Sequence, residues 1–358
     1  MESKSTQPSS FHLGYRPALD GIRGFAVLWV IGFHFNLPLG RDGLFGVDMF
    51  FVLSGFLITI LLVEEWEREG KVHFKNFYLR RILRLYPALL LLLIALCMIA
   101  PWPYIISTLF YFTNWVKALH LQPDSLFLDH TWSLSIEEQY YILWPIALTF
   151  LLKMKIHKRN LFLLPLLLGL ASAIARGIYW IATEDWFRVY MGTDLHADGL
   201  LIGSSFGLMT MYSFYPNFSK HKLIISLTTV ITFLFIFWLL IEKELTSSFI
   251  PLYGNLGISL GTIIIISRLI HFPSPFLIKI FSFSPLVKIG MISYGLYLWH
   301  APVGVVIDQV NFNLEPFLIS MCKIIATFLA AGLSYFLVEK PFLKLKDRFI
   351  SKQSSLTP

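Results

Sequence analysis

Residues 15–35 read YRPALDGIRGFAVLWVIGFHF, an apolar run with few polar side chains inside it. A bilayer core about 30 Å thick needs roughly 20 helical residues that are mostly apolar. Ionisable side chains within a membrane-spanning run are costly and usually mark function, and between residues 21 and 38 they are Arg23 and His34. The two lie close to three whole helical turns apart, or about 16 Å along the axis, so they share one face. The stretch predicts a membrane-spanning helix that carries a polar face.

The same apolar pattern continues along the rest of the chain. The 358 residues are 56% hydrophobic and only 14% charged, whereas roughly a quarter of the residues of a soluble protein are charged. We therefore predict an all-α, polytopic membrane protein with about ten transmembrane helices. The expected spans are residues 21–38, 47–63, 82–100, 132–152, 161–182, 196–213, 222–241, 250–267, 286–307 and 316–338.

The distribution of Lys and Arg predicts the orientation of these spans. With the N-terminus in the cytoplasm and the spans alternating, six of the 29 basic residues lie outside and 23 inside, as the positive-inside rule requires. The six are Arg41, Lys117, Arg176, Arg188, Lys243 and Lys323. Both termini are predicted to be cytoplasmic. Residues 103–116 are predicted as a re-entrant or surface segment, because an eleventh crossing would place four basic residues between 153 and 159 outside.

Three segments are predicted along the chain. Residues 1–14 form a polar tail without a signal-peptide pattern, residues 15–342 the transmembrane domain, and residues 343–358 a basic cytoplasmic tail. The net charge of +7 is explained by cytoplasmic loops, so no nucleic-acid partner is expected. The two cysteines, Cys97 and Cys322, lie inside apolar runs and predict neither a disulfide framework nor a metal site.

Polar residues in the outer halves of the predicted spans form one layer. Asp48 is expected near the level of His34, where it would orient the imidazole; the alternative is an acid favoured by the start of a helix. Glu137 opens the span at 132–152 beside aromatic residues, and the alternative there is an N-terminal capping turn. Asp198 and His300 complete the layer, and we expect Arg176 and Lys323 to pair with outer acids.

Basic residues gather at the inner ends of the first and third spans. Arg80 and Arg84 share a face by their i, i+4 spacing, and Arg81 lies between them. The planar donors of arginine suit phosphate, so a cytoplasmic phosphorylated ligand such as coenzyme A would fit here together with Asp20 and Arg23. The alternative is that these arginines bind anionic lipid.

Six short motifs resemble, in order, those of the acyltransferase-3 family of membrane O-acyltransferases. They lie between about residues 15 and 342, nearly the whole chain. They are Asp20-Gly-Ile-Arg23-Gly with His34, Gly46-Val-Asp48 to Ser54-Gly-Phe56, Phe77-Tyr-Leu-Arg80-Arg81-Ile-Leu-Arg84, Trp132-Ser133-Leu with Glu137, Ser293-Tyr294 with Tyr297 and His300, and Val338-Glu339-Lys-Pro341.

The resemblance implies transfer of an acyl group, commonly acetyl, from cytoplasmic acyl-CoA to a hydroxyl of a sugar. The acceptor would be a cell-surface glycan such as lipopolysaccharide O-antigen, an exopolysaccharide or peptidoglycan, or a glycosylated small molecule. The site would be in a bacterial inner membrane, with no permanently bound cofactor and no metal. Some relatives carry an additional hydrolase-like domain, and we expect this chain to act alone or with a partner.

The resemblance also implies roles for single residues. His34 would be the essential histidine, acting as general base or carrying the acyl group transiently, and Asp48 or Glu137 would orient it. Asp20, Arg23 and the arginine group would bind the donor. The acceptor would contact a third set of residues, namely Trp132, Ser133, Asp198, Tyr297 and His300. His196 stands where relatives often have arginine. The rival functions are a secondary transporter of a small anionic or sugar substrate and a scaffolding membrane protein.

Overall fold

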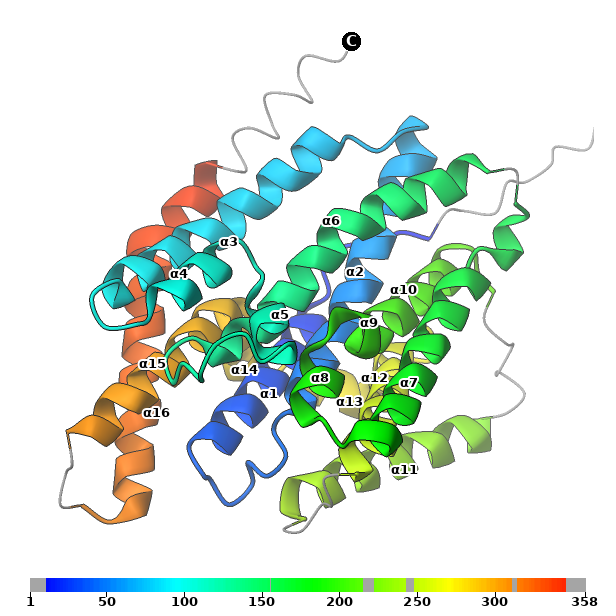
Figure 1. Ribbon diagram of the computed structural model, residues 1–358. Helices are drawn as coiled ribbons and strands as arrows, with labels where there is room; N and C mark the ends of the chain where they lie inside the picture. Colours follow the sequence, from blue (N-terminus) through cyan, green and yellow to red (C-terminus); the bar gives the residue numbers. More distant parts are fainter. Residues whose placement is uncertain (1–10, 155, 215–221, 243–247, 311–313, 346–358) are drawn as a thin grey trace, which may run out of the picture.

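The structure is a computed structural model that describes residues 11–154, 156–214, 222–242, 248–310 and 314–345, and these residues form helices and connecting turns without strands (Figure 1). Lys243, most of the N-terminal tail and most of the C-terminal tail lie outside the described residues. The helices are α1 (Pro17–His34), α2 (Phe45–Glu69), α3 (Phe74–Leu96), α4 (Trp102–Leu109), α5 (Thr113–Ala118), α6 (Trp132–Lys153), α7 (Leu163–Thr183), α8 (Trp186–Met191), α9 (Thr193–His196), α10 (Asp198–Met211), α11 (Lys222–Ile241), α12 (Asn255–Ile270), α13 (Pro275–Phe281), α14 (Ser284–Met291), α15 (Ser293–Gln309) and α16 (Pro316–Ser334). Short 3₁₀ turns occupy Asp129–Thr131 and Lys158–Asn160, and π-helical turns occupy Ile250–Gly254 and Tyr335–Glu339.

Helix occupies every one of the ten ranges predicted as spans, but fewer segments pass a strict test of length and composition. Five described segments are long and apolar enough to cross a bilayer, and a sixth qualifies if a bent pair is counted as one span. The five are Phe45–Glu69, Lys158–Thr183, Lys222–Ile241, Ile250–Ile270 and Pro316–Leu345. The protein is therefore a multi-pass integral membrane protein, while the number ten and the sides of the termini stay predictions.

The predicted span 286–307 is not one straight helix. It divides at Ile292 into α14 and α15, which are bent by 72°. The apolar sequence runs on across the break, so hydropathy alone predicts a continuous helix there. The bend lets α14 lie against α1 while α15 packs on α16.

Residues 103–116 form the two short helices α4 and α5, as expected of a segment that does not cross. Helix α4 has eight residues and is thus about 12 Å long, far short of the bilayer core. Pro101 provides its extended N-cap, and Pro103 lies in its first turn, where a missing N–H costs nothing.

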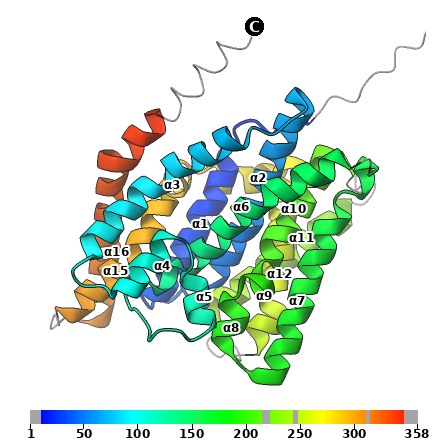
Figure 2. The ribbon, with the colours of Figure 1, turned by 45° about the horizontal axis from the view of Figure 1, so that its top comes forward.

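Helices α1 and α2 form the centre of the molecule. Both views show them between α15 and α16 on one side and α7, α10 and α12 on the other (Figures 1 and 2). Within its most apolar window α2 is 83% buried, whereas α11 and the Pro316–Leu345 segment are each 22% buried. In a lipid-facing protein the apolar side chains that protein does not cover meet lipid, so α11 and α16 form the rim and α2 the core.

Glycines allow α1 and α14 to touch through their backbones. A Cβ added at Gly290 would lie 1.8 Å from the carbonyl oxygen of Asp20, and one at Gly24 would lie 2.2 Å from that of Leu286. Small residues permit such close approach of helices in membranes. Gly24, next to Arg23, and Gly290 thus determine how closely α1 packs against α14.

Candidate active site

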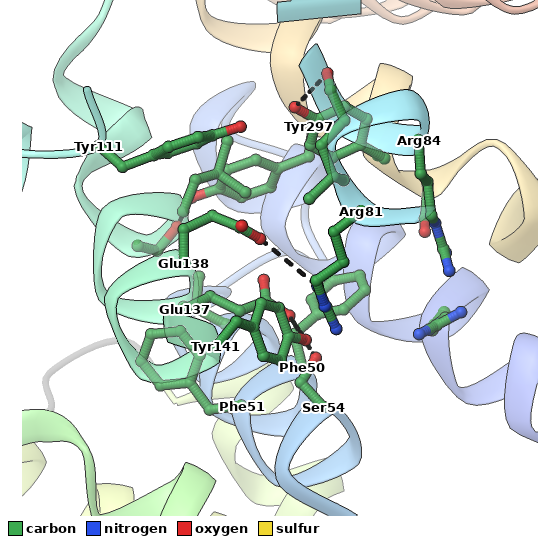
Figure 3. Close-up of a pocket in the computed structure, with 17 residues that line it drawn as sticks. Phe50, Phe51, Ser54, Arg81, Arg84, Tyr111, Glu137, Glu138, Tyr141 and Tyr297 are labelled. Atoms are coloured by element: carbon green, nitrogen blue, oxygen red, sulfur yellow. Dashed lines mark hydrogen bonds and ion pairs between the residues drawn. The ribbon is translucent and has the colours of Figure 1, made fainter. Parts of the chain in front are cut away.

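A cavity of about 90 Å³ opens between α1, α2, α3, α6 and α15, with Tyr111 closing it from the turn between α4 and α5 (Figure 3). It is large enough for several water molecules or a small acyl group. Its polar lining consists of Arg23, Ser54, Arg81, Arg84, Tyr111, Ser133, Glu137, Glu138, Tyr141, Ser293, Tyr294 and Tyr297.

Three of the four predicted arginines line this cavity. They are Arg23 on α1 and the pair Arg81 and Arg84 on α3, and the Arg84 side chain is exposed. Arg80 turns away and lies 3.9 Å from Glu65 at the end of α2. Arg80 and Arg84 share a face of α3 by their spacing, but the residues of this group that line the cavity are Arg81 and Arg84, which are three residues apart. Phosphate binding by the three lining arginines stays a prediction.

Asp20 lies near Arg23 at the start of α1, the end of the helix that the sequence predicts to face the cytoplasm. Its carboxylate lies 3.7 Å from the Arg23 guanidinium, one turn away on the same helix. Asp20 thus orients Arg23, and only Arg23 of the two lines the cavity.

Glu137 and Tyr141 form the other wall together with Arg81. Glu137 accepts hydrogen bonds from the Ser54 hydroxyl and the Tyr141 hydroxyl. The Arg81 guanidinium lies 3.1 Å above the Tyr141 ring and 3.5 Å from the Glu138 carboxylate. Glu137 therefore lines the same cavity as Arg81 and Arg84. The sequence analysis expected Glu137 to orient His34, but its hydrogen-bond partners are Ser54 and Tyr141.

His34 lies beyond this cavity at the end of α1. Its Nδ1 is 2.9 Å from the carbonyl oxygen of Val30, and the imidazole ring is exposed. Its ring centroid is 4.7 Å from that of His300 on α15. Because a carbonyl only accepts, Nδ1 carries the proton and Nε2 keeps its lone pair.

Asp48 contacts a different histidine from the one expected. Its Oδ1 is 2.8 Å from His196 Nε2 and accepts a 3.0 Å hydrogen bond from Asn255. The reason lies in the rotation of α2. Gly46 packs against Ala26 of α1, and two residues on, about 200° around the helix, Asp48 faces α9 and α12 instead.

Asp198 is fully buried in an ion pair with Arg176. The two bonds of this bidentate pair measure 2.6 and 2.8 Å, and Arg176 also donates to the carbonyl oxygens of Leu195 and Pro251. Both side chains are at most 1% exposed. Asp198 therefore has no free surface for an acceptor, and the expectation that it binds substrate is wrong. Arg176 and Lys323 each pair with an acid as expected, since Lys323 bonds Asp308 at 2.7 Å, while the side of the membrane on which these pairs lie stays a prediction.

The remaining predicted acceptor residues lie in three places. Ser133 and Tyr297 line the cavity, and their hydroxyls lie 2.6 Å apart. Trp132 stacks on His196, at 5.7 Å and 19°, behind the wall of the cavity. His300 lies with His34.

His130 was missed by the sequence reasoning. It occupies the 3₁₀ turn before α6, is buried, and its ring lies 5.1 Å from that of His300. Burial lowers its pKa to about 3, with the nearby His34 as a second cause, so His130 is neutral at pH 7. The available signal was its place directly before the Trp132-Ser133 motif. Tyr111 was also missed, because nothing in its short segment predicts which way it faces.

One group of possible metal ligands lies apart from the cavity. Glu65, Glu69 and His73, where α2 meets α3, have ligand atoms within 4.8 Å of one another. His73 is already paired with both carboxylates, at 2.9 and 3.2 Å. Nothing in this geometry connects the group to the cavity.

Comparison with known proteins agrees with the motifs. The family model described as an acyltransferase domain, Acyl_transf_3, matches residues 16–336. The chain is 34% identical to the peptidoglycan O-acetyltransferase OatA of Listeria monocytogenes, over 92% of this chain and 56% of the relative. It is 36% identical to the putative peptidoglycan O-acetyltransferase YrhL of Bacillus subtilis, over 96% and 57%. It is 33% identical to the O-acetyltransferase OatA of Staphylococcus aureus, over 92% and 57%.

The chain thus spans a little over half the length of these relatives, and no solved structure matches it. The family match covers both the arginine-lined cavity and the histidine at the end of α1. On this basis the chain belongs to the acyltransferase-3 family.

Proposed function

We propose that this protein is a membrane O-acetyltransferase that moves an acetyl group from acetyl-CoA to a hydroxyl of a cell-wall glycan. The observation that carries the proposal is the arrangement along α1. Arg23 lines a cavity with Arg81 and Arg84, and His34 lies about 16 Å further along the same helix, with an Nε2 that no described residue bonds. Helix α1 thereby provides both an arginine that can bind a polyanionic donor and a histidine that can act as the base.

The arginines provide the donor side. Arg84 is exposed at the edge of the cavity, where its guanidinium can bind phosphate groups of coenzyme A. A cavity of about 90 Å³ admits the acetyl end of the donor and not the nucleotide. This proposal places the arginines on the cytoplasmic side, in accord with the predicted topology.

His34 provides the base. Its Nε2 removes the proton of the acceptor hydroxyl while the hydroxyl oxygen attacks the thioester carbonyl. The new C–O bond forms, the C–S bond breaks, and the departing thiolate of coenzyme A takes the proton from the imidazolium. A two-step route, in which His34 Nε2 carries the acetyl group before the hydroxyl receives it, uses the same lone pair.

Peptidoglycan is the acceptor that we propose first. Two of the relatives are named for peptidoglycan O-acetylation, and none of the three names mentions the lipopolysaccharide that the sequence analysis gave as its example. The membrane would be the bacterial plasma membrane.

The test uses proteoliposomes that contain the full chain, [¹⁴C]acetyl-CoA and a muropeptide or glycan acceptor. Wild type should release coenzyme A and form a base-labile ester, and His34→Ala should abolish both while keeping its amount in the membrane. Ester formation by His34→Ala at the wild-type rate contradicts the assignment of the base. Uptake of a solute without ester formation by wild type favours the transporter instead.

A further inference from the structure

Three imidazoles gather on the far side of Tyr297 from the cavity. The ring of His300 lies 4.7 Å from that of His34, 5.1 Å from that of His130 and 5.2 Å from that of Tyr297. They come from three segments that are distant in sequence: the end of α1, the turn before α6, and α15. His34, His130 and His300 are called the histidine cluster below.

Backbone carbonyls determine the tautomer of every ring in the histidine cluster. His34 Nδ1 faces the Val30 carbonyl at 2.9 Å, His300 Nδ1 faces the Tyr297 carbonyl at 2.6 Å, and His130 Nε2 faces the Leu298 carbonyl at 3.2 Å. A carbonyl oxygen only accepts, so each of these nitrogens carries the proton. Each neutral ring then presents its other nitrogen as a bare acceptor.

Two of those acceptor nitrogens are buried and have no partner in the described part of the chain. They are His130 Nδ1 and His300 Nε2, and both rings are at most 6% exposed. Buried polar atoms are nearly always hydrogen-bonded, so an unpaired one indicates a ligand or a water that completes it. The missing partner must be a hydrogen-bond donor, because both nitrogens are unprotonated and carry a lone pair.

Tyr297 connects the histidine cluster to the cavity, because it lines the cavity while its ring lies 5.6 Å from that of His130 and 5.2 Å from that of His300. The Tyr297 hydroxyl lines the cavity, lies 2.6 Å from the Ser133 hydroxyl, and donates to the His130 carbonyl oxygen at 2.8 Å. The Tyr297 side chain is thus in contact both with the cavity that the arginines line and with two rings of the histidine cluster. A group held by the cluster lies next to whatever occupies the cavity.

We propose that His130 Nδ1 and His300 Nε2 form, with His34, a binding site for the hydroxyl-bearing acceptor. Hydroxyl groups of the acceptor donate to the two buried nitrogens, and this places the reacting hydroxyl at His34 Nε2. The site favours neutral polyols over carboxylates, which are ionised at pH 7 and have no proton to donate. This inference rests on the proposed function and adds His130 and the acceptor chemistry to it.

His130 and His300 exchange no proton in this scheme. The proton of the reacting hydroxyl passes to His34 and then to the thiolate, and the two other rings only accept hydrogen bonds. The pKa of His130, lowered by burial to about 3, agrees with a ring that stays neutral throughout.

The experiment compares His300→Leu with His300→Asn and His130→Leu with His130→Asn in proteoliposomes. Leucine removes the acceptor atom, while the asparagine side-chain oxygen can replace it. At saturating acetyl-CoA, each leucine variant should raise the KM for the glycan acceptor by about tenfold, the value of one lost hydrogen bond. Each asparagine variant should recover most of that loss, and the KM for acetyl-CoA should stay at the wild-type value in all four.

The outcomes separate this inference from the proposed function. Equal acceptor KM values for wild type and both leucine variants overturn it, and so does an equal loss in the leucine and asparagine variants. If leucine variants do not fold, the asparagine variants still test it, since a rise in their KM for acetyl-CoA contradicts an acceptor role. Failure of wild type to form any ester, or full activity of His34→Ala, overturns the proposed function itself.

Discussion

Replacing Arg176 by methionine should destabilise the protein far more than it affects substrate binding. The guanidinium is 1% exposed and makes two bonds to Asp198, at 2.6 and 2.8 Å, and one each to the carbonyl oxygens of Leu195 and Pro251. Removing one partner of a buried pair leaves an uncompensated charge and typically costs about 3–5 kcal/mol. Proteins are commonly stable by only about 5–15 kcal/mol, so this is a large share of the total.

The matched control is the double variant Arg176→Met/Asp198→Leu. Replacing both members of a buried ion pair by apolar residues is often neutral or even stabilising by about 1–4 kcal/mol, so the double variant should be more stable than the single one. Thermal unfolding of the purified protein in detergent measures both, and the acceptor KM is measured alongside. A loss below about 1 kcal/mol in Arg176→Met refutes the reasoning. So does an Asp198→Asn variant of wild-type stability with a raised acceptor KM, which would return Asp198 to the acceptor site.

Three further perturbations test other parts of the structure. Asp48→Ala should lower the free energy of unfolding by about 1–3 kcal/mol, because His196 loses its partner, and leave the pH profile of the residual activity unchanged. Gly290→Ala should reduce the amount of folded protein in membranes, since its Cβ would meet an α1 carbonyl oxygen at 1.8 Å, whereas Gly332→Ala, with no atom within 4 Å, should have no effect. Lowering the pH from 7 to 4 should destabilise wild type more than His130→Asn, as calorimetry can show. The unfolded chain protonates this residue near pH 6.5 and the folded one only near pH 3, so folded stability falls as the pH drops between the two.

The sequence was sufficient for what hydropathy and helical periodicity determine. Every predicted span contains helix, the segment around residues 103–116 is short and broken, and Arg23 lies on α1 with His34 as their spacing requires. These properties are local, because burial in lipid and a repeat of 3.6 residues act on each helix separately.

The sequence was insufficient for what depends on the order of helices around α1 and α2. Asp48 was expected to orient His34, but its side chain bonds His196 of α9 and Asn255 of α12 instead. Gly46 held the missing information, since a glycine two residues before Asp48 marks the face that touches α1. Likewise, the 72° bend at Ile292 leaves no mark in the hydropathy, and α14 on one side of it contacts the backbone of α1 through Gly290.

The contacts of α1 with α13 and α14 have a consequence for how sequences of this fold can vary. At Asp20, Phe281 and Leu286 it is the carbonyl oxygen, and not the side chain, that meets a glycine of the opposing helix. Exchanges that keep the backbone in place at these three positions leave the contact intact, whereas any side chain at the glycines pushes the helices apart. Helix α1 carries His34, and α14 leads into the helix that carries His300. Substitutions at the three carbonyl positions therefore preserve the distance between the two imidazoles. Substitutions at the glycines change that distance, although they lie more than two helical turns from either histidine.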